Sequence, residues 1–215
     1  MSFSTLFFDL DATLYSANNG LWDQIRNRIF QFMREVVGIP EQEVIPTRDH
    51  YWKTYGTTLE GLRIHHQVDP ERYLAYVHEI PLEDYLQQDP ELKEILASLP
   101  QELWVFTNSD RPHAQAVLDA LGIREQFSGI IDLLAMGFAI KPQPEAYQIA
   151  LKTAGVKDPT RSILFDDLWA NLLGARSQGM KTALVNLDGQ ENGADYHLAR
   201  VHDIKEIIPQ LWSGS

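Results

Sequence analysis

The sequence contains no cysteine. A chain without thiols cannot form disulfide bonds, attack a substrate with a thiolate, or hold zinc or an iron–sulfur cluster through sulfur. Any chemistry that this protein performs must therefore rely on oxygen and nitrogen groups.

Basic residues are few compared with acidic ones, with 18 Lys and Arg against 30 Asp and Glu, which gives a formal net charge of −12. This surplus of negative charge opposes a broad surface for a nucleic-acid polymer or an anionic membrane. An acidic protein can still bind a phosphate group locally, where a cation and a few Lys or Arg side chains offset the charge. We therefore expect a small-molecule partner.

Long apolar runs are missing too, since none approaches the roughly 18 residues that a membrane-spanning helix needs. The first residues, Met1 to Thr5, carry no basic group and lead directly into an expected strand, unlike a signal peptide. We expect a cytoplasmic protein, either a monomer or a homodimer.

Short apolar runs without polar alternation are typical of buried parallel strands. The 215 residues, 44% of them hydrophobic and 22% charged, leave room for one α/β domain and a modest second unit. Strands are expected at 6–8, 103–106, 129–134, 162–165 and 181–185, the third being the weakest. Residues 189–196 are polar and contain glycine, which predicts a loop.

A helical pattern fills the long gap between the first two strands. Apolar residues recur every three or four positions from Leu21 to Val37, and Gly38 and Pro40 end that pattern. Further helices are expected from about 40 toward 55 with an interruption at Pro46, and at 58–66, 70–78 and 90–98. Helices that alternate with the later strands are expected at 112–121, 144–154, about 171–179 and 203–211.

These patterns predict an α/β protein with a Rossmann-like parallel sheet and an inserted helical cap. The core comprises residues 1–16 and 88–215, and the all-helical cap comprises residues 17–87, after the first strand. Because the insertion begins beside two carboxylates, we expect a lid that excludes water and selects the substrate. A helical elaboration without a catalytic part would give the same pattern.

Two carboxylates follow the first strand, Asp9 and Asp11. Ligands of open α/β sheets bind at the carboxyl ends of the strands. Two carboxylates this close repel each other unless a cation lies between them or one is protonated. The turn at Ala12 and Thr13 should separate the two side chains, one toward a metal and one toward a leaving group. Alternatively, the pair only ends a strand and begins a turn.

Three later strands also end in polar groups. Thr107 and Asn108 follow the second, where a hydroxyl and an amide can hold phosphate oxygens. Lys141 lies beyond the third and offers a fixed cation, and Asp167 follows the fourth. Asp9, Asp167 and the backbone carbonyl of Asp11 would give the few oxygen ligands that suit Mg²⁺. Each residue alone has an ordinary explanation as a helix cap or solvated loop residue, but together they predict metal-assisted phosphoryl transfer.

On these residues the chain resembles the haloacid dehalogenase-like hydrolase superfamily, and the resemblance covers nearly the whole chain. The superfamily's first motif, Asp-x-Asp-x-Thr, stands at Asp9 to Thr13. Its later motifs are matched by Thr107, by Lys141 before a proline, and by the acidic pair at 166–167 with Asn171. Ala12 departs from the commoner Gly or Asn.

The resemblance implies a role for each of these residues. Asp9 is expected to be the nucleophile and Asp11 the general acid and base. Thr107, with Asn108, is expected to bind phosphate, and Lys141 to neutralise both nucleophile and phosphate. Asp167 is expected to bind Mg²⁺, and the adjacent Asp166 is expected to support the site or to join the metal ligands.

Asp11 favours a phosphatase, because the name-giving dehalogenases generally lack this second carboxylate. Residues 11–15 and 51–56 look similar to the pyrimidine 5′-nucleotidase group. The resemblance thus implies a Mg²⁺-dependent phosphomonoesterase that acts through an aspartyl-phosphate, most readily on pyrimidine nucleoside 5′-monophosphates. Three alternatives stay open: the same chemistry on phosphoglycolate, a sugar phosphate or pyridoxal phosphate; a catalytically silent protein that binds a phosphorylated ligand; and, more distantly, a 2-haloacid dehalogenase.

Substrate recognition is expected from aromatic and amide side chains of the cap and of the strand ends. Aromatic faces can stack on a base and amides can bind its edge. Asn19 and Trp22 are the favoured candidates. The other candidates are Asn18, Tyr55, His65, His66, Met136 and Trp169. Each has an ordinary alternative role in packing or at the surface.

Overall fold

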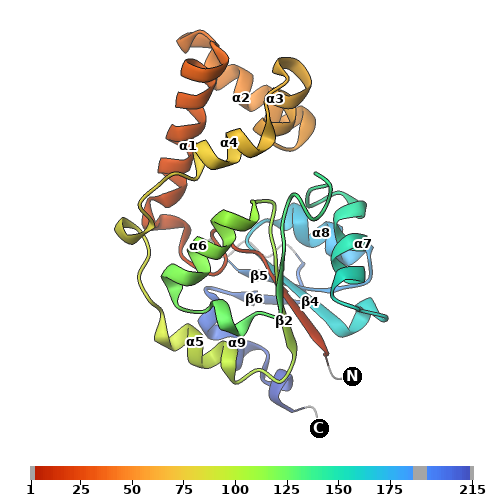
Figure 1. Cartoon of the computed structure of the whole chain (residues 1–215). Coiled ribbons are helices and arrows are strands. Elements are labelled where there is room, and N and C mark those ends of the chain that lie inside the picture. The colour runs from red at the N-terminus through yellow and green to blue at the C-terminus, as the bar shows by residue number, and fades with distance from the viewer. Residues whose placement is uncertain (1–2, 186–192, 214–215) are drawn as a thin grey trace. The chain divides into compact units, whose positions relative to one another are not determined.

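The computed structural model describes residues 3–185 and 193–213. The chain divides into two compact units, of which one comprises Met1–Ala17 and Leu86–Ser215 and the other Asn18–Tyr85. We call them the core unit and the helical unit (Figure 1). None of the helices in the described residues has both the length and the apolar character that a membrane crossing requires.

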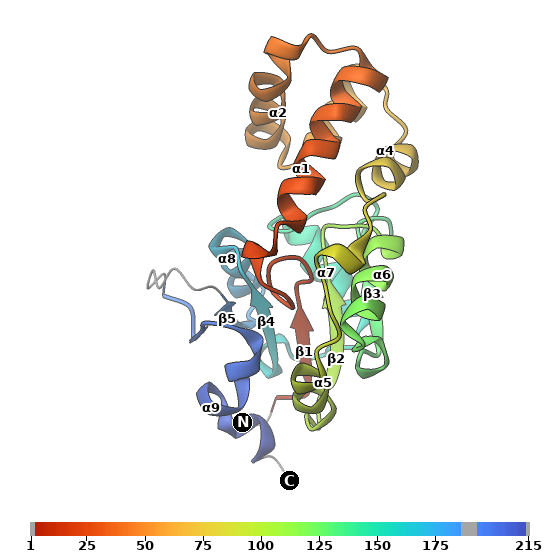
Figure 2. The ribbon, with the colours of Figure 1, turned by 90° about the vertical axis from the view of Figure 1, so that its left-hand side faces the viewer.

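A parallel sheet lies at the centre of the core unit, which confirms the predicted fold class. Its strands are β1 (Thr5–Phe8), β2 (Glu102–Phe106), β3 (Gly129–Ile131), β4 (Ser162–Asp166), β5 (Lys181–Val185) and β6 (Tyr196–Leu198). They lie in the order β3-β2-β1-β4-β5-β6, and every neighbouring pair is parallel. β1 lies between β2 and β4 (Figure 2).

Two strand predictions differ from the structure. β3 ends at Ile131, three residues before the predicted end, because a turn begins after Asp132. β6 was not predicted, and its first residue, Tyr196, ends the predicted loop 189–196. Residues 189–192 of that loop lie outside the described residues.

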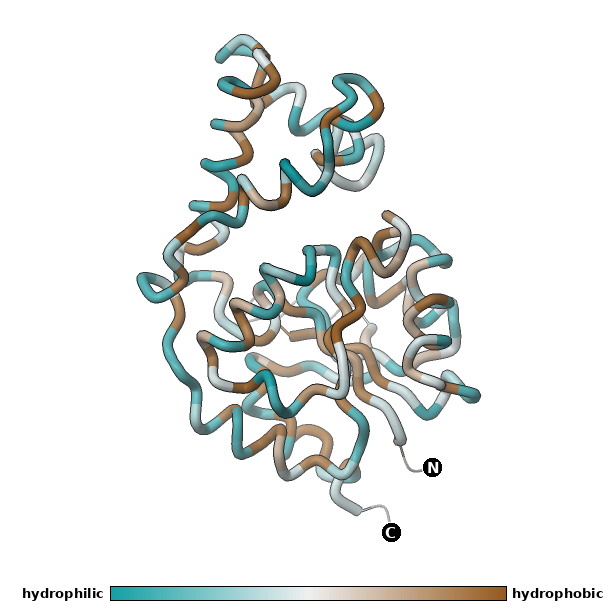
Figure 3. Tube along the Cα trace, in the orientation of Figure 1, coloured by the Kyte–Doolittle hydropathy of each residue, from teal (hydrophilic) through white to brown (hydrophobic). Residues whose placement is uncertain are grey.

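Aromatic side chains fix β1 between the two layers of helices. Phe8 stacks on Phe165 of β4 with centroids 4.6 Å apart, and Phe7 meets Phe106 of β2 edge to face at 6.2 Å. Both β1 phenylalanines are fully buried, and burial of one such side chain stabilises the fold by about 1.5–3 kcal/mol. Figure 3 shows hydrophobic residues along the strands at the centre of this unit.

Helices cover both faces of the sheet. α5 (Pro90–Ala97) and α6 (Arg111–Leu121) lie on one face, and α7 (Pro144–Thr153) and α8 (Trp169–Ser177) lie on the other (Figure 1). The predicted last helix, 203–211, is divided into α9 (Ile204–Ile207) and two flanking 3₁₀ turns, Val201–Asp203 and Pro209–Trp212. Pro209 has no N–H to donate, so the α-helical hydrogen bonding of α9 cannot continue through it.

The helical unit contains α1 (Leu21–Phe32), α2 (Glu41–Tyr55), α3 (Thr58–His66) and α4 (Pro70–Val77), and a π-helical turn, Met33–Val37, extends α1. The predicted interruption at Pro46 is wrong, because α2 runs through it. Pro46 is the sixth residue of α2, beyond the first turn, and its missing N–H removes one hydrogen bond of the helix. The buried side chains Val44 and Tyr51, seven residues apart on one face, pack both parts of the helix against the unit.

α2 and α3 approach closely at Gly61. A Cβ atom at this position would lie 2.1 Å from Cγ of Tyr51, a buried ring. The Tyr51 hydroxyl lies 3.0 Å from Nε2 of His66, and its ring stacks on His65 at 5.2 Å. Only glycine allows this packing, so residue 61 determines the distance between the two helices.

Gly61→Ala is expected to destabilise the protein by about 1–3 kcal/mol, because the ring or the helix must shift. Thermal unfolding would measure the loss. In a Tyr51→Ala background the same change should cost much less, since the clashing ring is absent. An equal loss in both backgrounds would show that Tyr51 is not the obstacle.

Candidate active site

The expected site residues lie at the carboxyl ends of the strands. The order of the strands reverses at β1, and α/β sheets bind ligands at such a point. The Asp9 N–H donates to the Phe165 carbonyl at 2.8 Å, which extends the β1–β4 pairing by one residue. The Thr107 N–H donates to the Ile131 carbonyl at 3.0 Å in the same way. Backbone pairing therefore fixes where Asp9 and Thr107 leave the sheet.

The Lys141 ammonium joins the ends of three strands, β1, β2 and β4. Its Nζ donates to Asp9 Oδ1 and to Asp166 Oδ2, both at 2.7 Å, and to the Phe106 carbonyl at 2.8 Å. The side chain is 1% exposed. Burial alone would lower the pKa of Lys141, but the carboxylates of Asp166 and Asp9 outweigh it and hold this pKa above its ordinary value. Lys141 is therefore a permanent positive charge beside Asp9.

Asp166 supports this arrangement and is fully buried. Its Oδ1 accepts from the Leu168 N–H at 2.9 Å and from Asn171 Nδ2 at 2.9 Å. Its Oδ2 accepts from Lys141 at 2.7 Å and from the same Asn171 amide at 3.1 Å. Both oxygens are thus already bonded, which suits the predicted supporting role.

Three carboxylates meet beside Lys141. Asp9, Asp166 and Asp167 each offer an oxygen, and these oxygens lie within 4.8 Å of one another. Burial raises the pKa of Asp9 well above its ordinary range; Lys141 opposes this, and repulsion from Asp166 and Asp167 adds to it. Burial and the Asp166 charge raise the pKa of Asp167 to about 7.

A hard divalent cation fits this cluster. Mg²⁺ takes oxygen ligands, and its charge would relieve the two carboxylates whose pKa values are raised. Asp9 and Asp167 are the predicted metal ligands that the structure brings together. The predicted contribution of Asp11 through its backbone carbonyl stays a prediction, and its carboxylate is bonded elsewhere.

Thr107 and Asn108 follow β2 as predicted. The Thr107 hydroxyl is buried and accepts from the Ser109 N–H at 3.0 Å. The Asn108 amide brackets Lys141, since Nδ2 donates to the Lys141 carbonyl at 3.0 Å and Oδ1 accepts from the Lys141 N–H at 2.8 Å. The roles of both residues in phosphate binding stay predictions. The Asn108 side chain has a further task, which is to fix the segment that carries Lys141.

Asp11 has partners other than those of Asp9. Its Oδ1 accepts from the Tyr15 hydroxyl at 2.7 Å and lies 2.8 Å from His113 Nε2, and its Oδ2 accepts from the Ser109 hydroxyl at 2.7 Å. Burial would raise the pKa of Asp11, but these bonds, led by His113, hold it well below its usual range. The carboxylate of Asp11 is therefore ionised in the unliganded site.

The turn at Ala12 directs the side chains of Asp9 and Asp11 toward different partners. Ala12 has φ of 62°, in the left-handed region, which costs a residue with a Cβ about 1–2 kcal/mol. Glycine and asparagine tolerate this region better, which gives a physical reason for their greater frequency at this position of the motif. Asp9 faces Lys141, whereas Asp11 faces Ser109 and His113.

Sequence reasoning gave no role to Tyr15, Ser109 or His113. Tyr15 and Ser109 stand within the motif stretches, but serine is common in turns and a tyrosine often has an ordinary role in packing. The signal for His113 was its place on the buried face of α6, with Ala114 and Val117, at a strand end that already carried polar groups. A histidine on such an apolar face needs a polar partner, and Asp11 is that partner.

The predicted substrate readers of the cap belong to the helical unit. Asn19 caps the start of α1, since its Oδ1 accepts from the Leu21 N–H at 3.0 Å and its Nδ2 donates to the Tyr85 carbonyl at 3.3 Å. Trp22 is 37% exposed, and the Tyr55 hydroxyl lies 2.7 Å from His65 Nε2. Asn18 is exposed. The parts of all these residues in binding stay predictions.

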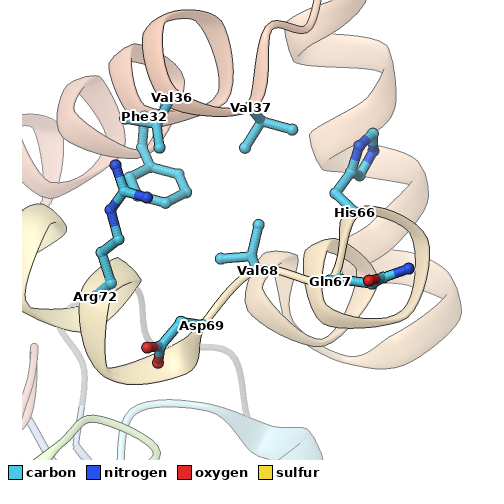
Figure 4. Close-up of a pocket in the computed structure, with 8 residues that line it drawn as sticks. All are labelled: Phe32, Val36, Val37, His66, Gln67, Val68, Asp69 and Arg72. Carbon is cyan, nitrogen blue, oxygen red and sulfur yellow. The ribbon is translucent and has the colours of Figure 1, made fainter.

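The helical unit contains a cavity of about 310 Å³ (Figure 4). Its volume is at the lower end of the range of small-molecule sites, about 300–1,000 Å³. Its lining residues are Phe32, Val36, Val37, His66, Gln67, Val68, Asp69 and Arg72. His66 is the predicted reader that lines it. The last two candidates lie in the core unit. Met136 belongs to a cluster of buried hydrophobic residues there, and the partly buried Trp169 packs against that cluster.

A sequence model of the haloacid dehalogenase-like hydrolases matches residues 3–179. The chain belongs to this family. Phosphate metabolism protein 8 of Saccharomyces cerevisiae is 27% identical to it over 93% of this chain and 67% of the yeast protein. A phosphatase of Mycobacterium tuberculosis is 26% identical over 88% of this chain and 90% of its own length.

Solved structures of the family share the fold. A phosphatase of the family from Thermococcus onnurineus superposes with a TM-score of 0.67 at 18% identity, over 94% of this chain and 96% of its own. At this identity the match shows the fold alone. The family and its phosphatase relatives support the interpretation of the core unit as a hydrolase.

Asp167→Asn is expected to raise the melting temperature of the metal-free protein at pH 8. The unfolded chain releases the Asp167 proton near pH 3.8, whereas the folded chain retains it up to about pH 7. Stability therefore falls as the pH rises between these values. At higher pH this penalty is on the order of 4 kcal/mol, and the amide removes it.

Thermal unfolding in chelator, from pH 5 to pH 8, would measure the difference, which should shrink as the pH falls below 7. The exposed residue Asp84 provides the control, because Asp84→Asn should melt like the wild type. Added Mg²⁺ should raise the melting temperature of the wild type more than that of Asp167→Asn. A variant no more stable than the wild type at any pH would contradict the proposed strain at Asp167.

Proposed function

We propose that the protein is a Mg²⁺-dependent phosphomonoesterase that acts through an aspartyl-phosphate at Asp9. The observation that supports this most is the Lys141 ammonium, bonded to Asp9 and Asp166 at 2.7 Å, beside Asp167. This arrangement places the nucleophile beside a fixed positive charge, where the negative charge of a phosphate must be neutralised. Asp11 stands apart from it with its own partners.

The residues of the chain suit two consecutive transfers. In the first, an Asp9 oxygen attacks phosphorus, the bond to the leaving oxygen breaks, and that oxygen takes a proton from Asp11, which gains it from solvent when the substrate binds. In the second, Asp11 takes a proton from water as the water oxygen attacks phosphorus and releases Asp9. Lys141 stays protonated throughout and stabilises the negative charge.

A bound Mg²⁺ would supply further charge neutralisation for the phosphate at the Asp9–Asp167 side of the cluster. Thr107 would bind a phosphate oxygen through its hydroxyl.

We infer that the substrates are small phosphate esters, with pyrimidine nucleoside 5′-monophosphates favoured. The support is the similarity of residues 11–15 and 51–56 to the pyrimidine 5′-nucleotidase group. Aromatic side chains such as Tyr55 and Trp22 could contact a base. The presence of Asp11 argues against a dehalogenase, because the departure of a halide needs no proton.

Phosphate release in the presence of Mg²⁺ tests the proposal. The panel comprises UMP, CMP, dTMP, AMP, GMP, phosphoglycolate, sugar phosphates and pyridoxal phosphate. We expect UMP and CMP to be preferred, chelator to abolish release, and Asp9→Asn to lower kcat at least about 10³-fold.

Preference for another ester would be compatible with the proposed mechanism but would reject pyrimidine nucleoside 5′-monophosphates as the favoured substrates. Release that persists in Asp9→Asn would reject Asp9 as the nucleophile. No release from any ester by the wild type would reject the phosphatase.

Asn108→Ala is expected to lower kcat by about 10- to 100-fold, because Lys141 loses both bonds that fix its backbone and small misplacements in an active site are costly. Release of p-nitrophenol from p-nitrophenyl phosphate would measure it. Asn27→Ala, at an exposed position of α1, is the matched control. Unchanged turnover in Asn108→Ala would show that Lys141 keeps its position without the two hydrogen bonds from the Asn108 side chain.

A further inference from the structure

The carboxylate of Asp11 is held on both oxygens by side chains from three segments of the core unit. Tyr15 follows β1, Ser109 follows β2, and His113 lies in the first turn of α6. All three contacts are 2.7–2.8 Å long. The side chain that must pass a proton thus has its direction fixed before any substrate binds.

The three partners differ in rigidity. The hydroxyls of Tyr15 and Ser109 can rotate about their C–O bonds, so each can donate in several directions. The Nε2 atom of His113 belongs to a rigid ring, so its hydrogen bond can point in one direction only. The His113 side chain is 1% exposed and belongs to the buried face of α6. His113 is therefore the partner whose hydrogen bond to Asp11 has a fixed direction.

A purely structural account of His113 is weak. Burial of a polar ring costs free energy unless the ring is hydrogen-bonded, and an apolar residue would fill this place on α6 at no such cost. The neighbours Ala114, Val117 and Leu118 on the same buried face are apolar. The imidazole is thus explained by the group that it contacts, Asp11.

We propose that His113 is a positioning residue that orients the Asp11 carboxyl group for proton transfer to the leaving oxygen. The inference rests on the proposed phosphatase function. His113 itself exchanges no atom with the substrate: the proton passes from Asp11 to the leaving oxygen as the phosphorus–oxygen bond breaks. The loss of His113 should therefore matter most where the leaving group needs that proton.

Two esters of nearly the same shape separate this effect from general damage. The p-nitrophenolate of p-nitrophenyl phosphate is a weak base and leaves without a proton, whereas the phenolate of phenyl phosphate is a stronger base and benefits from one. The ratio kcat/KM reports the steps up to the first phosphoryl transfer, so later hydrolysis of the aspartyl-phosphate does not affect the comparison.

Three variants at position 113 carry the test, each measured with Mg²⁺ in the full chain. His113→Leu keeps the volume and removes the polar contact. It should lower kcat/KM for phenyl phosphate by about 10- to 100-fold and for p-nitrophenyl phosphate by less than about fivefold. His113→Gln has an amide nitrogen at a similar reach and should restore most of the loss. His113→Asn is too short to reach Asp11 and should behave like His113→Leu.

Thermal unfolding of each variant shows whether it is folded. If His113→Leu does not fold, the kcat/KM values of His113→Asn and His113→Gln are compared instead. An equal fall for the two esters, or no fall for either, would overturn the positioning role and leave the phosphatase intact. A wild type that hydrolyses neither ester would instead reject the proposed function.

Discussion

The site depends on one buried cation. The Lys141 side chain is buried away from solvent, yet it remains protonated because two carboxylates lie 2.7 Å from its Nζ. A buried charge is tolerated only when it is paired and hydrogen-bonded, and here the partners are the candidate nucleophile Asp9 and the fully bonded Asp166. Removal of Lys141 would leave the carboxylates of Asp9 and Asp166 without their common positive charge. Stability and chemistry are thus coupled at this point of the molecule.

The cluster remains negative even so. Asp9, Asp166 and Asp167 meet one ammonium group. A phosphate would add further negative charge, which the proposed Mg²⁺ would neutralise as substrate and nucleophile approach each other. The raised pKa values of Asp9 and Asp167 express the same need in the unliganded protein. The negative charge of the cluster and the raised pKa values of two of its members thus both favour a bound cation.

The layout of the fold could be predicted from the sequence because it depends on local patterns. Apolar runs located β1, β2, β4 and β5, and periodicity located the helices. Local patterns failed where tertiary contacts decide: Pro46 is tolerated because buried neighbours hold α2, and the short strand β6 has too few residues to give a signal of its own.

In the site, the residue types at the strand ends were predicted, but their hydrogen bonds were not. The contact between Asp11 and His113 joins residues 102 positions apart. The bracket between Asn108 and the Lys141 backbone joins residues 33 apart. Neither leaves a spacing that a single sequence can reveal, because only the meeting of the strand ends in space makes them neighbours.

The division of the chain into two units has an evolutionary consequence. The described hydrogen bonds among Asp9, Asp11, Lys141 and Asp166 and their partners all lie within one unit. Sequence drift in residues 18–85 therefore leaves these hydrogen bonds intact, and under the proposed function it is the change that would alter which molecules are accepted. New specificities in such a lineage would arise by change in the inserted segment, on an inherited chemical core.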